Sequence, residues 1–144
     1  MASVSTYLNF EASTERAFEF YKSVFGTEYA GPIHRIKDLP PKPGQTLTEE
    51  QGNRIMHMAL PILGGHLLMG TDVPKVTAGD NVQIFIAPDT RAQAEQLFAA
   101  LAKGGKVVMP LEDQFWGAYF GQLVDPFGVQ WLVNVDRAPK AGAA

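Results

Sequence analysis

The hydrophobic and polar positions of the chain switch between two periods, which predicts strands and helices in turn. Residues 4–10 are β-branched and aromatic with near two-residue alternation, which is typical of a strand. The apolar residues of 14–25 then recur at three- and four-residue spacing and predict an amphipathic helix. Ser13 or Thr14 is expected to cap its start, and Gly26 to end it in the left-handed conformation.

The same order of elements follows twice along the chain. In the first half, an excursion over 38–52 separates a strand from a pair of strands that meet at a Gly64-Gly65 turn. In the second half, Thr90 is expected to cap a helix that ends at Gly104-Gly105. The remaining predicted strands are residues 29–36, 54–62, 66–70, 82–87, 106–111, 116–123 and 129–135.

A sequence offset of about 76 residues superimposes Thr14 on Thr90, at the two helix starts. The sequence therefore predicts an α+β fold of two βαβββ modules, residues 1–75 and 76–137, with a flexible tail at 138–144. The modules are expected to form a curved mixed sheet around a cleft, in one compact domain overall. A single continuous α+β sheet without pseudo-symmetry is the alternative.

Composition narrows the function classes. The 144 residues are 46% hydrophobic and 19% charged, as in a globular protein, and the net charge of −3 offers no basic surface for nucleic acid. Cysteine is absent, which excludes disulfides and thiolate metal ligands. No apolar run approaches the roughly 20 residues that span a bilayer, and the first residues lack a secretion signal. We expect a soluble, cytoplasmic protein without a membrane or nucleic-acid partner.

Two segments resemble a known family. Residues 16–26 and 125–131 are similar to signatures of the vicinal oxygen chelate superfamily, which contains glyoxalase I, bleomycin resistance proteins and extradiol dioxygenases. Residues 7–11, 55–62, 68–72 and 114–117 narrow the resemblance to its PhnB-like (YjdN) branch. The resemblance implies paired βαβββ modules, a homodimer, and a ligand cavity between module sheets.

The resemblance also allows a residue-by-residue test for a metal. Metal-using relatives hold a divalent ion with His, Glu or Gln on the first and fourth strands of each module. Those positions fall here on Thr6, on Leu68 or Met69, on Val82 or Gln83, and on Leu132. Most of these side chains cannot bind such an ion, so no metal and no other cofactor is expected. A divalent metal outside these positions stays open.

His57 is the strongest candidate for chemistry among the three histidines. Met56 and Met58 flank it inside a predicted strand, so it is either a half-buried structural residue or a pocket group that binds a ligand or moves a proton. Glu49 or Glu50 on the preceding loop would be close enough in sequence to orient it. His66 is expected at a solvated turn, about 20 Å along the strands from His57, and a three-histidine site with His34 is not expected.

Residues 114–121 carry four aromatics interrupted by glycines, which suits either a core or an aromatic-lined pocket. On an alternating strand, Trp116 and Tyr119 point to opposite faces, and either is a pocket candidate. Trp131 is expected in the core.

Two functions follow. The first is a metal-free protein that binds an unidentified small molecule in an aromatic-lined cleft. The alternative is a glyoxalase- or dioxygenase-type lyase or oxidoreductase, with a non-standard metal site or with His57 as catalytic acid or base. The predicted ligand-binding residues are Thr6, Leu8, His57, Met69, Trp116, Tyr119 and Leu132.

Overall fold

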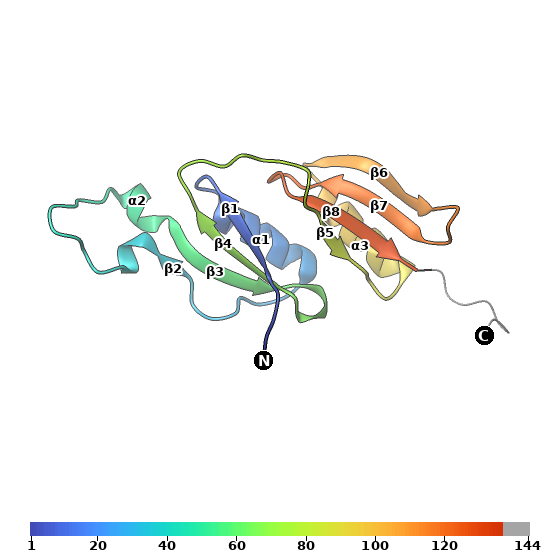
Figure 1. Cartoon of the computed structure of the whole chain (residues 1–144), viewed down its shortest axis with the longest axis horizontal. Coiled ribbons are helices and arrows are strands. Elements are labelled where there is room, and N and C mark those ends of the chain that lie inside the picture. Colours follow the sequence, from blue (N-terminus) through green and yellow to red (C-terminus); the bar gives the residue numbers. More distant parts are fainter. Residues whose placement is uncertain (137–144) are drawn as a thin grey trace. The chain divides into compact units, whose positions relative to one another are not determined.

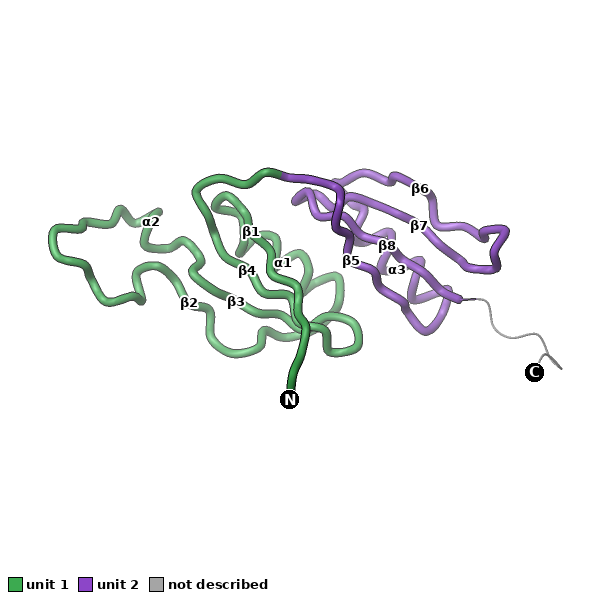
Figure 2. Tube along the Cα trace, viewed as in Figure 1, with its two compact units in different colours: residues 1–77 green, residues 78–144 purple. Residues whose placement is uncertain are grey.

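The computed structural model describes residues 1–136. The chain divides into two compact units, one spanning Met1–Thr77 and the other beginning at Ala78 (Figure 2). Each unit contains one four-stranded mixed sheet and one long helix, so each is a βαβββ module, as the sequence predicts.

Unit 1 has the sheet order β1-β4-β3-β2 (Figure 1). β1 runs parallel to β4, and β3 is antiparallel to both β4 and β2. The elements are β1 (Thr6–Phe10), α1 (Thr14–Phe25), β2 (His34–Arg35), the 3-10 turn η1 (Ile36–Asp38), α2 (Glu49–Asn53), β3 (Ile55–Pro61), the 3-10 turn η2 (Leu63–Gly65) and β4 (Leu67–Asp72).

α1 forms where the apolar spacing predicts it. Ala17, Phe18 and Tyr21 are fully buried against the sheet, and Gly26 ends the helix with a φ of 66°. Gly70 on β4 lets the helix come close, because a Cβ there would lie 2.7 Å from the Phe18 ring. The spacing of apolar residues therefore determines which face of α1 packs against the sheet, and Gly70 marks where it packs.

Unit 2 repeats this topology with the order β5-β8-β7-β6, again with its first strand parallel to its last. The elements are β5 (Ile84–Ile86), α3 (Arg91–Ala102), β6 (Lys106–Asp113), β7 (Tyr119–Val124) and β8 (Gln130–Val135). Trp131 is fully buried with Leu101, Leu123 and Val133, which confirms its expected place in the core. The shared strand order confirms the predicted repeat.

Two predicted strands are wrong in extent. Only His34 and Arg35 of the predicted strand 29–36 pair with β3, since Gly31 adopts a φ of 79° next to Pro32 and breaks the extended run. The predicted strand 116–123 begins instead at Tyr119. The Gln114 amide donates to the Ala118 carbonyl at 2.8 Å and closes a turn before it.

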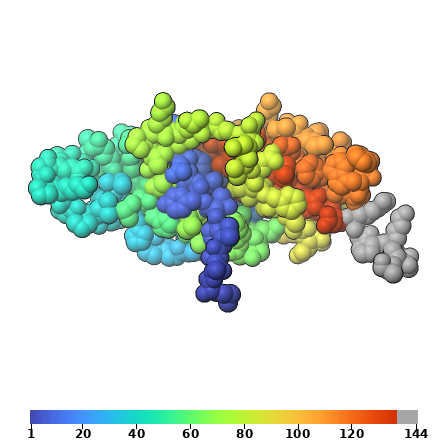
Figure 3. All heavy atoms as spheres, viewed as in Figure 1, coloured from blue at the N-terminus to red at the C-terminus, as the bar shows by residue number. Residues whose placement is uncertain are grey.

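The excursion between η1 and α2 is a surface feature of unit 1. Every residue from 37 to 51 is exposed, and the atoms of this segment form a lobe at one end of unit 1 (cyan in Figure 3). Thr48 caps α2 by accepting a hydrogen bond from the Gln51 amide. Within residues 1–136, no helix is long and apolar enough to cross a membrane.

Candidate functional site

The two faces of the unit 1 sheet have different surroundings. Gly70 faces α1, because a Cβ on it would meet Phe18 and Thr14. Side chains alternate along a strand, and in-register neighbours share a face. Met69 on β4, its partner Tyr7 on β1, and His57 on β3 therefore lie on the face opposite α1.

Three rings cross that face side by side. The Tyr7 hydroxyl lies 3.3 Å from His57 Nδ1, and the two ring centroids are 5.9 Å apart. The His34 ring lies on the other side of His57, with its centroid 6.5 Å away. We call this arrangement the Tyr7–His57–His34 row. It brings together residues from the first, third and second strands of the module.

The row presents several hydrogen-bonding groups without being buried. His57 is half-buried, His34 is exposed and Tyr7 is 47% exposed. A neutral imidazole has one donor and one acceptor nitrogen, so engagement of Nδ1 by Tyr7 leaves Nε2 for another partner. The row can therefore bind the polar group of a ligand or transfer a proton to or from it.

The structure places two of the predicted ligand-binding residues on the other face. Thr6 and Leu8 pair in register with Leu68 and Gly70, so they share the face that α1 covers. The Thr6 hydroxyl lies 2.8 Å from His66 Nε2. The expectation that His66 is merely solvated is therefore wrong, because its ring is held by β1.

The group that orients His57 also differs from the sequence expectation. Glu50, one of the two proposed carboxylates, forms an ion pair with Arg54 at 3.9 Å, and the partner found for His57 is Tyr7. Sequence reasoning missed Tyr7 and His34. Tyr7 stands one residue from the predicted Thr6, and the alternation of exposed and half-buried residues in β1 would identify it only once the register with β4 is known.

In unit 2 the predicted aromatics separate. Tyr119 faces α3, where its hydroxyl donates to Glu95 at 3.0 Å and Arg91 lies 4.3 Å from its ring centroid. The hydrogen bond to Glu95 raises the pKa of Tyr119. Trp116 lies in the turn before β7, 54% exposed, with its ring 6.0 Å from that of Phe120.

Leu132 lies on the face of the unit 2 sheet opposite α3. Its register partners are Phe85 and Gln122. Gly121, which precedes Gln122 on β7, faces α3 because a Cβ there would meet Phe98, so Gln122 and Leu132 face the other way. Phe85 is 56% exposed. This face therefore carries the apolar side chains of Leu132 and Phe85 beside the polar Gln122.

A metal site needs several His, Asp or Glu side chains close together. Among residues 1–136, no three His, Asp or Glu side chains come together as a metal site requires. His34 and His57 are neighbours, while His66 is held by Thr6. The residues present do not fit the divalent ion of the metal-using relatives.

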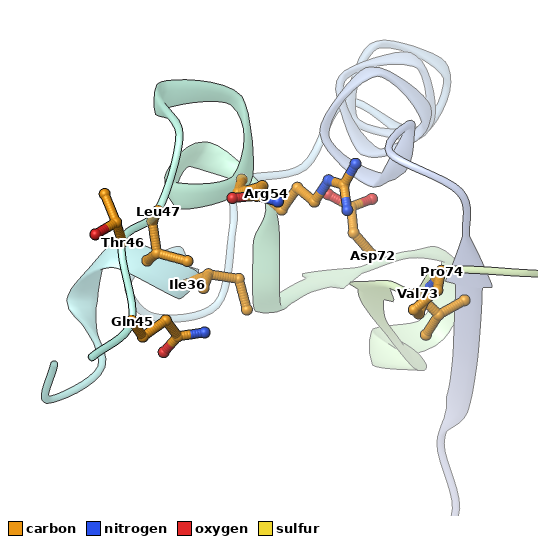
Figure 4. A pocket seen from close by; sticks show the side chains of 9 residues that line it. Ile36, Gln45, Thr46, Leu47, Arg54, Asp72, Val73 and Pro74 are labelled. Carbon is orange, nitrogen blue, oxygen red and sulfur yellow. The ribbon is translucent and has the colours of Figure 1, made fainter. Parts of the chain in front are cut away.

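A pocket of about 380 Å³ lies at the end of the unit 1 sheet (Figure 4). We call it the sheet-end pocket. It lies between the excursion, η1 and the last residues of β4. Its lining residues are Ile36, Gln45, Thr46, Leu47, Gln51, Arg54, Asp72, Val73 and Pro74.

The chain is built from two βαβββ units with the same strand order, which places it in the class of proteins that share this repeat. The chain belongs to the glyoxalase/bleomycin resistance protein/dioxygenase superfamily, whose sequence model matches residues 8–133.

Relatives support the PhnB-like (YjdN) branch within that superfamily. Protein YjdN of Escherichia coli K12 is 26% identical over 141 residues, which cover 92% of this chain and 94% of YjdN. The crystal structure of protein PA1353 from Pseudomonas aeruginosa is 33% identical, with a TM-score of 0.80 over 96% of this chain and 100% of that one. A PhnB protein from Bacillus cereus is 25% identical, with a TM-score of 0.73 over 93% of this chain and 99% of that one.

Proposed function

We propose that this protein binds a small organic molecule without a metal or other cofactor, on the face of the unit 1 sheet opposite α1. The ligand contacts the Tyr7–His57–His34 row through a polar group and the flanking Met69 through an apolar part. Small-molecule sites commonly combine an apolar surface with a few placed polar groups. The protein is expected to act in the cytoplasm.

The observation that supports the proposal is the contact between the Tyr7 hydroxyl and His57 Nδ1 at 3.3 Å. It favours one orientation of the imidazole on a face that α1 does not cover. An oriented imidazole with its second nitrogen available is partly preorganised to meet a ligand, which reduces the entropy lost on binding.

The experiment is an NMR screen of the isotope-labelled, metal-stripped chain against small aromatic and heteroaromatic compounds. The proposal predicts that compounds which bind shift the signals of Tyr7, His34 and His57 together, and that binding persists in chelator. His57→Asn is expected to weaken binding about tenfold, as loss of a single good hydrogen bond would.

His66→Asn is the matched control, since it makes the same change in the same unit at a ring held by Thr6. It is expected to leave the affinity unchanged. Equal weakening by both variants, or signal shifts confined to residues away from the row, would remove this face as the binding site.

The same hydrogen bond favours one alternative function, proton transfer by His57 in a glyoxalase-type reaction. In the tautomer in which Nδ1–H donates to the Tyr7 hydroxyl, Nε2 carries the lone pair and can act as general base. This alternative predicts turnover of a bound compound that His57→Asn abolishes and Tyr7→Phe reduces. Binding without turnover supports the binding protein.

A further inference from the structure

The sheet-end pocket has a chemistry that the Tyr7–His57–His34 row lacks. Apolar side chains of Ile36, Leu47 and Val73 form part of its wall. Arg54 reaches across the pocket, and its guanidinium points toward Asp72 (Figure 4). The pocket therefore combines an apolar surface with one strong cationic donor.

The hydrogen-bonding capacity of Arg54 is not used up. Its Nε is buried and has no hydrogen-bond partner. Its ion pair with Glu50 spans 3.9 Å, and the Glu50 side chain is 80% exposed, so solvent screens the pair. The Arg54 side chain as a whole is 41% exposed, so its outer nitrogens can donate to an acceptor that enters the pocket.

The polar neighbours of Arg54 already have partners within the chain. The two Asp72 oxygens accept hydrogen bonds from the amides of Thr14 at 3.1 Å and Ile55 at 2.8 Å. The Gln51 side chain accepts from the Thr48 amide at 3.0 Å as part of the α2 cap. These acceptors are therefore engaged elsewhere, and the charge on its guanidinium makes Arg54 the strongest donor in the lining.

We infer that the sheet-end pocket binds a small monocarboxylate with an apolar body. The carboxylate meets the Nη1 and Nη2 edge of the guanidinium, since the Arg54 side chain is 41% exposed, and two parallel hydrogen bonds there match its geometry. The apolar body covers Ile36, Leu47 and Val73. The negative charge of Asp72 beside Arg54 disfavours a second negative charge, so dicarboxylates and phosphate bind more weakly. This inference stands independently of the proposed function.

The test is an NMR titration of the isotope-labelled full chain with benzoate, benzamide and phthalate at neutral pH. Benzoate is expected to shift the signals of Leu47, Gln51, Arg54 and Val73. Benzamide and phthalate are expected to bind about tenfold more weakly, because one lacks the charge and the other adds a second. Equal affinities for benzoate and benzamide, or shifts elsewhere only, would overturn the inference.

Variants separate the pocket from a general charge effect. Arg54→Gln is expected to remove benzoate binding, while Lys42→Gln removes one positive charge from the excursion, outside the lining residues, and leaves benzoate binding intact. Leu47→Trp fills the pocket without touching Arg54 and is also expected to weaken benzoate, which keeps the test valid if Arg54→Gln fails to fold. Unchanged binding in Leu47→Trp, or equal loss in Lys42→Gln, contradicts the inference.

Discussion

Asp125 is a buried carboxylate whose hydrogen bonds hold the turn before β8. It is 2% exposed and accepts from the Phe127 amide at 2.8 Å, the Val129 amide at 3.1 Å and Trp131 Nε1 at 2.8 Å. Asp125→Asn would replace one acceptor oxygen with an NH2 donor. A buried N–H that now donates to that oxygen would then face another donor. We expect the free energy of unfolding, measured with denaturant, to fall by about 1–3 kcal/mol.

Asp80→Asn is the control for that change, since Asp80 is exposed. It is expected to change the free energy of unfolding by less than about 0.5 kcal/mol. An equal effect of the two substitutions would show that the carboxylate at 125 does not hold this turn. Asp followed by Pro and, two residues later, Gly is a typical turn sequence, whereas the bond from Trp131 to Asp125 depends on the packed core.

Gly26 and Gly128 adopt left-handed backbone conformations, with φ of 66° and 90°. No atom lies within 4 Å of an added Cβ at either position, so the cost of a side chain there comes from the backbone conformation. Gly26→Val and Gly128→Val are expected to lower the free energy of unfolding by about 1 kcal/mol or more. Gly26→Asn should cost less, since Asn tolerates this region, and thermal unfolding unaffected by both Val variants would contradict the argument.

At the scale of elements, an ion pair joins β2 to α1. Arg35 donates from Nη1 and Nη2 to the two Glu15 oxygens at 3.0 and 2.6 Å. The hydrogen bonds from Arg35 hold the pKa of Glu15 below its ordinary 4.5. The stabilisation from this pair is therefore present above pH 4.5 and is lost as the pH falls through the lowered pKa.

Glu15→Gln is accordingly expected to lower the melting temperature at pH 7, with a difference from the parent that shrinks as the pH falls below 4.5. Glu28→Gln is the control, because Glu28 is 88% exposed and its pair with Lys22 spans 3.5 Å. The melting-temperature difference caused by Glu15→Gln could instead be constant with pH, or no larger than that caused by Glu28→Gln. Either result would show that the ion pair does not hold β2.

The helices and the repeat could be predicted from sequence because their signals are local. Thr90 caps α3 by accepting a hydrogen bond from the Gln93 amide, as its spacing predicts. The Gln93 side chain accepts a hydrogen bond from the Asp89 amide instead of the Thr90 amide. The extents of the strands are harder to predict from the sequence. A two-residue pairing such as β2, or the turn at 114–118, depends on which partner strand is within reach, and that is set by the folded sheet.

At the scale of the whole molecule, the site depends on register between strands far apart in sequence. His57 and Met69 were predicted and lie on the face opposite α1, whereas Thr6 was predicted one residue from Tyr7. A shift of one residue moves a side chain to the other face of a sheet. The sequence thus indicates the strands that carry the site, and the register decides which of their residues form it.

We also expect the protein to form a homodimer. Large apolar side chains remain exposed in unit 2, including Phe115 at 98%, Val82 at 74% and Phe85 at 56%. Contact with a second copy of the chain would cover these side chains. Light scattering should give twice the chain mass of 15.7 kDa, with Phe115→Ser and Phe85→Ser shifting it toward one chain. A monomer at all concentrations would contradict this.

Elemental analysis of the purified protein before and after chelation tests whether the proposed small-molecule site works without a metal. We expect far less than one metal ion per chain and the same melting temperature after chelation. Near-stoichiometric zinc, nickel, iron or manganese, removed by chelator with a fall in the melting temperature, would contradict it and favour a metal-dependent enzyme.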